Sequence, residues 1–209
     1  MTSASLSSSS QPVVPERCTA ADLAARLQAG SAALFPTDTL PALAAAPAHA
    51  GQIWQLKQRP PEKPLILMAA DLSQLQQVLG GPWKPQWLEL AEVVWPGAVT
   101  LVLPASGCWA DALHPGGASL GLRIPACEPA RDLLRCSGPL ATTSANRSGN
   151  PAATSSDQAA AMFPSVPQLE PVPWPAAAGT ASTVLAWNHE SWRMLRAGAS
   201  LPKHPLLLF

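Results

Sequence analysis

The sequence has few charged residues: Asp, Glu, Lys and Arg make up 12% of its 209 positions, against about 25% in ordinary soluble domains. The formal net charge is zero, so no overall basic surface exists to drive nonspecific binding to duplex nucleic acid. Any contact with nucleic acid must therefore come from a local cluster of cations.

Several common site signatures are also missing. The four cysteines form no C-x-x-C pair and lie far from the histidines, which argues against a zinc site and favours an intracellular domain with free thiols. No G-x-G-x-x-G or G-x-x-x-x-G-K-[ST] loop occurs, so neither a Rossmann site nor a P-loop is supported. No apolar run reaches the roughly 18 residues that a membrane helix needs. We expect a cytoplasmic protein without membrane attachment.

The sequence is long enough and apolar enough, at 47% hydrophobic residues, to fold as one well-buried domain. We assign this domain to residues 17–200. Residues 1–16 are rich in serine and have neither a basic nor an apolar leader region, so we expect a disordered lead-in. Residues 201–209 form an apolar tail without an assigned structure.

Hydrophobic periodicity predicts an alternation of short helices and strands. Helices are expected at 19–27, 52–58, 72–79, 87–94, 128–135 and 155–163. Strands are expected at 32–35, 64–69, 99–103, 120–124, 140–142, 183–187 and 192–195. Residues 40–51 read as a small-residue connection, 108–119 as a surface loop and 164–178 as a proline-rich connector. The absence of a strict βαβ repeat predicts an α/β domain with a mixed, twisted sheet flanked by helices.

Polar side chains gather after the first predicted strand. Thr37 and Thr39 follow it directly, and the cations Lys57, Arg59 and Lys63 lie on a loop that two prolines stiffen. Hydroxyls and cations of this kind suit a polyanion such as a nucleoside triphosphate, because Arg and Lys pair with phosphate oxygens. The alternative is a solvated basic loop.

A second polar segment, residues 141–151, carries hydroxyls, amides, an arginine and a glycine behind an apolar run. Such a loop suits a phosphate or a ribose, whereas the alternative is an ordinary polar turn. Cations also lie at the ends of two later strands: Arg123 alternates with Leu122 and Ile124, and Arg196 precedes Gly198.

Together, seven short motifs resemble the YrdC-like family, the threonylcarbamoyl-AMP synthases, in its short single-domain form. They are PTDT at 36–39, KQRPPEKPL at 57–65, WPGAVTLVL at 95–103, LGLRIP at 120–125, TSANRSG at 143–149, STVL at 182–185 and LRAGA at 195–199. The resemblance implies a twisted α/β sheet around a basic cavity. It also implies a reaction that joins L-threonine, bicarbonate and ATP into threonylcarbamoyl-adenylate and pyrophosphate, for N6-threonylcarbamoylation of adenosine 37 in tRNA.

The resemblance also implies roles for individual residues. ATP contacts fall on Lys57, Arg59, Lys63, Thr142, Ser144, Asn146 and Arg196, with Asn146 supporting its loop. Threonine contacts fall on Thr37, Thr39, Arg123 and Ser182, with Arg123 a partner for the carboxylate. No nucleophile and no protein ligand for a metal is implied, and Mg²⁺ is expected on the ATP. Expected partners are tRNA and the proteins that transfer the threonylcarbamoyl group.

One stretch departs from the family pattern. Where the family reads PTDT-V-Y-G-L-G, this chain continues from PTDT with Leu40, Pro41, Ala42, Leu43 and Ala44. Proline fixes its own φ and alanine resists positive φ, so we expect the loop to take a different path if the usual path needs those freedoms. Two alternatives to an active synthase remain: a non-catalytic relative that binds RNA or a nucleotide, and a carbamoyl-adenylate-forming domain like those of hydrogenase maturation proteins.

Overall fold

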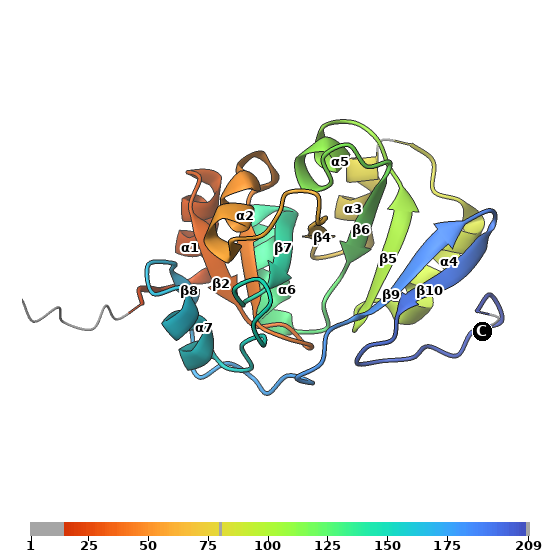
Figure 1. Ribbon diagram of the computed structural model, residues 1–209. Coiled ribbons are helices and arrows are strands. Elements are labelled where there is room, and N and C mark those ends of the chain that lie inside the picture. The colour runs from red at the N-terminus through yellow and green to blue at the C-terminus, as the bar shows by residue number, and fades with distance from the viewer. Residues whose placement is uncertain (1–14, 80, 208–209) are drawn as a thin grey trace, which may run out of the picture.

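A computed structural model describes residues 15–79 and 81–207. Ten strands form one mixed sheet in the order β1-β8-β2-β3-β7-β4-β6-β5-β9-β10. The strands are β1 (Arg17–Cys18), β2 (Ala32–Phe35), β3 (Ala42–Ala45), β4 (Ile66–Met68), β5 (Val99–Pro104), β6 (Ser119–Arg123), β7 (Leu140–Ser144), β8 (Gln168–Leu169), β9 (Thr183–Asn188) and β10 (Ser191–Arg196). In Figure 1 the sheet runs from β8 and β2 at one side of the molecule to β9 and β10 at the other.

Helices flank this sheet, which confirms the predicted fold class (Figure 1). They are α1 (Ala20–Gln28), the 3₁₀ turn η1 (Pro47–His49), α2 (Gly51–Lys57), α3 (Leu72–Leu79), α4 (Pro85–Val94), α5 (Cys108–Leu113), α6 (Glu128–Ser137) and α7 (Ser156–Met162). No helix of the described segments combines the length and the apolar character needed to cross a bilayer.

The two faces of the sheet are buried to different extents. Strand residues such as Leu34, Leu67 and Leu101 belong to the larger core, which also takes in residues of α2, α3, α4 and α7. On the opposite face Phe35 and Met68 pack with α1 and α6. Alternation along each strand separates the two sets. Because α1 and α6 cover only part of the second face, its remainder is available for a site.

The helices and strands expected from periodicity are present, with bounds shifted by a few residues. The predicted loop at 108–119 is wrong, because it contains α5 and the first residue of β6. Gly107, with φ of 89°, precedes a helix of only six residues, in which Ala110 and Leu113 are buried. A helix this short barely develops a recognisable period, and the glycines that follow it favour a loop assignment.

The connection predicted at 40–51 also contains regular structure, namely β3, η1 and the first residue of α2. Alanine is a weak strand former, so ALAA gives little local signal. Burial between two neighbours decides the outcome, since β3 pairs antiparallel with β2 and with β7. The connector at 164–178 likewise contains the two-residue strand β8.

The ends of the chain follow the predictions in part. The expected lead-in at 1–16 lies almost wholly outside the described residues. Residues 201–207 have no helix or strand, and Leu206 and Leu207 pack against the larger core. The tail therefore belongs to the packed body of the domain as far as residue 207.

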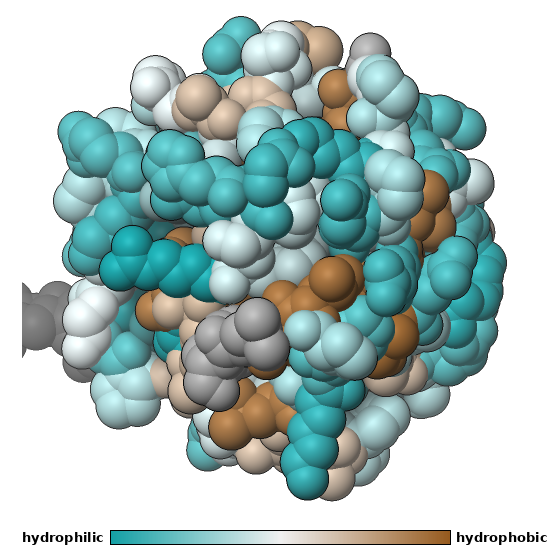
Figure 2. Space-filling model, turned by 90° about the vertical axis from the view of Figure 1, so that its right-hand side faces the viewer, coloured by the Kyte–Doolittle hydropathy of each residue, from teal (hydrophilic) through white to brown (hydrophobic). Residues whose placement is uncertain are grey.

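Figure 2 looks onto the end of the molecule that carries β9 and β10, where a mostly hydrophilic surface is broken by apolar patches.

Candidate functional site

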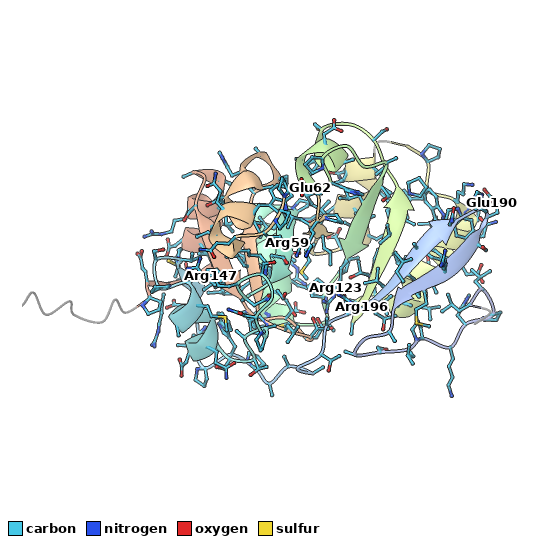
Figure 3. All side chains as sticks on the ribbon, viewed as in Figure 1. Arg59, Glu62, Arg123, Arg147, Glu190 and Arg196 are labelled. Atoms are coloured by element: carbon cyan, nitrogen blue, oxygen red, sulfur yellow. The ribbon has the colours of Figure 1, made fainter. Side chains whose placement is uncertain are left out.

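A cavity of about 420 Å³ opens on the face of the sheet that α1 and α6 leave uncovered. This volume lies within the roughly 300–1,000 Å³ that small-molecule sites occupy. Seven of the eleven residues predicted for ligand binding line it: Thr39, Arg59, Arg123, Thr142, Ser144, Ser182 and Arg196. Figure 3 shows Arg59, Arg123 and Arg196 near the middle of the molecule, whereas Glu190 lies at its far end.

Strand alternation explains which side chains reach the cavity. On β6, Ser119, Gly121 and Arg123 line it, while Leu120 and Leu122 are buried in the larger core. On β5, Thr100 and Val102 line the cavity. Successive residues point to opposite faces, so alternate residues of β5 and β6 contribute to one wall.

Arg123 is anchored at the base of this wall and is 2% exposed. Its Nε donates to the Gly97 carbonyl at 3.0 Å, Nη1 to the Thr39 hydroxyl at 2.7 Å, and Nη2 to Asp38 Oδ1 at 2.8 Å. Burial lowers the pKa of Arg123, and the Asp38 carboxylate opposes that change. A guanidinium has five N–H donors, and three are used, so two remain for a ligand.

The hydroxyl of Thr37 organises the loop beside Arg123. It accepts from the backbone N–H groups of Thr39 and Leu40, at 3.1 and 3.2 Å, and donates to the Leu40 carbonyl at 2.7 Å. Thr37 is buried but does not line the cavity, whereas Thr39 does. Thr37 therefore sets the geometry from which Thr39 faces a ligand.

The divergent stretch after this loop keeps the cavity open. Leu40 and Ala42 line the cavity, and Ala42 pairs with Ser144 in the sheet. No residue from 40 to 45 has a positive φ, so proline and alanine fit this path without the strain that glycine would relieve. The stretch thus makes an ordinary entry into β3, and a path different from that of the family stays a prediction.

Lys57 lies beneath the β7 loop and not in the cavity wall. Its Nζ donates to the carbonyls of Ser144 at 2.5 Å and Asn146 at 2.7 Å, and to Asn146 Oδ1 at 2.8 Å. Burial, with a smaller effect of Arg59, lowers the pKa of Lys57 to about 7. Lys57 thus holds the loop together from behind the cavity wall, and its predicted ATP contact stays a prediction.

Asn146 completes this loop and is likewise absent from the cavity lining. Its Oδ1 accepts from Ser144 Oγ at 2.7 Å, and its Nδ2 donates to the carbonyls of Arg147 and Asn150. The predicted loop-supporting role agrees with these bonds. Ser144 is thereby oriented at the cavity wall by a fully bonded amide.

A further wall comes from β9, β10 and β5. Arg196 Nη2 donates to the Ser182 carbonyl at 2.7 Å, and Ser182 Oγ lies 2.8 Å from Thr100 Oγ1. A register shift between Met194 and Arg196 marks a bulge, and Leu195 also lines the cavity. Bulges of this kind re-aim side chains.

The two cations of the proline-stiffened loop differ in position. Arg59 lines the cavity, its Nη2 donates to the Pro64 carbonyl at 3.0 Å, and burial lowers its pKa. Lys63 is exposed and does not line the cavity. Its predicted ATP contact stays a prediction.

Four polar lining residues escaped the sequence prediction: Thr100, His114, Ser119 and Thr143. Alternation offered a signal for Ser119 and Thr100, which share a face with Arg123 and Val102 respectively. Thr143 lies within β7, between Thr142 and Ser144, and His114 directly follows the unpredicted helix α5. Neither feature is visible in the hydrophobic pattern.

The charge of the lining has one sign. Three arginines contribute to it, and within the described parts of the chain no Asp or Glu does. Those parts also hold no group of three or more His, Cys, Asp or Glu placed to bind a metal. Guanidinium groups and hydroxyls without a competing carboxylate favour an anionic ligand with several acceptor oxygens.

Comparison with known proteins identifies relatives of this chain. The Sua5/YciO/YrdC family model, described as "Telomere recombination", matches residues 25–198. The threonylcarbamoyl-AMP synthase of Bacillus subtilis is 38% identical over 148 residues, which are 67% of this chain and 42% of that protein. The protein of the same name from Stenotrophomonas maltophilia is 38% identical over 137 residues, 62% of this chain and 72% of the relative.

Solved structures agree with the sequence matches. P. abyssi Sua5 complexed with L-threonine has a TM-score of 0.79 and 30% identity, over 88% of this chain and 57% of that one. E. coli YciO has a TM-score of 0.75 at 20% identity, over 92% of this chain and 96% of that one, and shows the fold alone. The chain thus spans less than half of the B. subtilis relative and somewhat more than half of the archaeal one.

Proposed function

This chain belongs to the Sua5/YciO/YrdC family, and from that premise we propose that it is a threonylcarbamoyl-AMP synthase. Its substrates would be L-threonine, bicarbonate and ATP, and its products threonylcarbamoyl-adenylate and pyrophosphate. The observation that carries the proposal is the cavity itself, in which three arginines and a set of hydroxyls face one space without a carboxylate. Such a lining neutralises and orients a triphosphate and a carboxylate together.

The proposed reaction needs positioning more than a protein nucleophile. Threonine and bicarbonate give the N-carboxylated amino acid with loss of water and a proton. One carboxylate oxygen then attacks the α-phosphorus of ATP, a P–O bond forms, and pyrophosphate leaves with the electrons of the broken bond. A site that holds the carboxylated threonine and ATP in line raises their effective concentration. Cations near the phosphates offset the negative charge that develops on the leaving pyrophosphate. In this scheme Arg59, Ser144 and Arg196 hold the nucleotide.

The threonine end is assigned to Arg123, Thr39 and Ser182, next to Arg196. The two free N–H donors of Arg123 suit its carboxylate, and Thr39 and Ser182 offer hydroxyls nearby. Mg²⁺, when bound to the triphosphate, would neutralise part of its charge. Since the described lining has no carboxylate, phosphate oxygens and not side chains of this chain would hold that ion.

The product fits a place in tRNA modification, with transfer of the threonylcarbamoyl group to adenosine 37 by partner proteins. This assignment, a cytoplasmic location and any direct contact with tRNA belong to the proposal. The cavity is open beside the divergent stretch, where Leu40 and Ala42 line it, and this supports the proposal. A non-catalytic relative that binds a nucleotide would keep the same cavity, so substrate dependence has to separate the two.

Substrate dependence tests the function directly. We expect pyrophosphate release from ATP only when L-threonine and bicarbonate are both present, because neither alone supplies the carboxylated nucleophile. Mass spectrometry should detect threonylcarbamoyl-adenylate in the complete mixture alone. Nucleotide binding without pyrophosphate release in saturating bicarbonate would favour the non-catalytic relative.

The loop cations offer a test of the nucleotide assignment. Arg59→Ala should weaken ATP binding about tenfold, since a charge-assisted hydrogen bond contributes roughly 1.5–3 kcal/mol. Lys63→Ala removes a cation from the same loop, but an exposed one, and should have a smaller effect. Calorimetric titration of both variants measures the difference. Equal affinities of Arg59→Ala and the unaltered protein would remove Arg59 from the site.

A further inference from the structure

His114 lines the cavity, but the proposed reaction gives it no role. It follows α5 directly and is half-buried. It is also the one ionisable lining residue, among those described, that is not an arginine, and an imidazole, unlike a guanidinium, can accept a proton as well as donate one.

The imidazole is held in a defined orientation. Its Nδ1 lies 2.9 Å from the Ser119 carbonyl, and since a carbonyl only accepts, Nδ1 carries the hydrogen. The ring also packs directly over Gly117, where a Cβ would lie 2.2 Å from Nδ1. The Gly117 N–H donates to the His114 carbonyl at 2.8 Å. Nε2 is therefore the ring nitrogen left to meet a ligand.

Two contacts place His114 near Arg59. The Leu113 carbonyl accepts from the Leu65 N–H at 2.8 Å, and Arg59 donates to the carbonyl of the adjacent Pro64. Both residues thus approach the cavity beside the same short segment.

Several other ionisable groups lie on the elements around the ring. They are Cys108 and Asp111 on α5, His49 on the turn η1 that packs against α5, Arg123 on β6, and Arg59, Glu62 and Lys63 on the loop that bonds Leu113. Apart from the arginines, these side chains are exposed and none of them lines the cavity. The charges that share the cavity with the imidazole are therefore arginines.

The geometry points to His114 as a further phosphate-binding residue, one that takes up a proton from solvent when a polyphosphate enters the cavity. Three arginines line the same cavity, so a polyphosphate is the class of ligand that this lining favours. When a polyphosphate is bound, the imidazolium donates through Nε2–H to a phosphate oxygen. This inference rests on the proposed function, since it takes the polyphosphate to be ATP.

The pH dependence of ATP binding tests this coupling. Titration calorimetry at pH 6 and pH 8, in two buffers of different ionisation enthalpy, measures both affinity and proton uptake. The ratio of affinities at the two pH values should be about tenfold larger for the unaltered protein than for His114→Gln. Protonation of ATP itself contributes equally to both proteins and cancels in this comparison.

Two further variants control the result. His49→Gln removes a histidine outside the cavity, so its ratio of ATP affinities at pH 6 and pH 8 should equal that of the unaltered protein. Gly117→Ala displaces the ring, because its Cβ would clash with the imidazole. The ratio of ATP affinities at pH 6 and pH 8 should therefore fall as it does in His114→Gln. Circular dichroism checks that each variant is folded, and Gly117→Ala alone decides the question if His114→Gln does not fold.

An equal pH ratio in His114→Gln and the unaltered protein, with ATP binding intact, overturns the inference and leaves the proposed function standing. If no pyrophosphate is released but the ratio of ATP affinities at pH 6 and pH 8 still depends on His114, only the proposed function is overturned. If ATP does not bind at either pH, both are overturned.

Discussion

Replacing Arg123 by alanine should raise the KM for L-threonine by one to two orders of magnitude while changing the KM for ATP far less. The guanidinium has two N–H donors free at the cavity, and a charge-assisted hydrogen bond to a carboxylate contributes roughly 1.5–3 kcal/mol. The same change leaves Asp38 without its cation, so we also expect some loss of stability. Steady-state kinetics with each substrate varied in turn measures the two constants.

The matched control is Arg193→Ala on strand β10, at the edge of the sheet. Arg193 is exposed and does not line the cavity, so both KM values should stay unchanged. An equal rise of the threonine and ATP constants in Arg123→Ala would show that Arg123 supports the whole site, and its assignment to the threonine carboxylate would be wrong.

Arg123 also shows what local pattern can predict. Alternation in LGLRI places it opposite Leu122, and the structure confirms a buried core position for Leu122 and a cavity position for Arg123. A two-residue period survives folding because it is a property of the strand itself. The main helices and strands were predictable for the same reason.

Elements whose stability comes from distant partners were not predictable. The alanine-rich β3 is a strand because β2 and β7 bond to both of its edges, and sequence near residue 42 contains neither neighbour. Lys57 presents the same difficulty. Its spacing from Arg59 suggests a shared ligand, whereas its acceptors lie about 90 positions later in the chain, at Ser144 and Asn146.

The position of Lys57 has a physical reason and one consequence for the site. A buried cation must find acceptors, and Lys57 finds them in the β7 loop, which orients Ser144 at the cavity. The motif TSANRSG therefore carries both a ligand-facing hydroxyl and the acceptors that fix it. Part of the family pattern in this chain thus reflects support of the site rather than contact with the ligand.

Replacing Gly198 by alanine should lower the free energy of unfolding by about 3 kcal/mol, at the upper end of the usual overpacking cost. A Cβ at this position would lie 2.3 Å from the Ala181 carbonyl oxygen and 2.4 Å from backbone atoms of Ser182 and Thr183. Backbone atoms cannot rotate away as a side chain does. The segment that carries Arg196 would have to move from the Ser182 carbonyl it bonds.

ATP binding should therefore weaken in the same variant, since Ser182 and Arg196 form one wall of the cavity. Gly51→Ala is the matched control, because a Cβ there meets nothing within 4 Å and alanine suits the first turn of α2. Urea denaturation and ATP titration of both variants give the comparison. If Gly198→Ala is as stable as Gly51→Ala and binds ATP equally well, close packing at residue 198 does not hold the Arg196 wall in place.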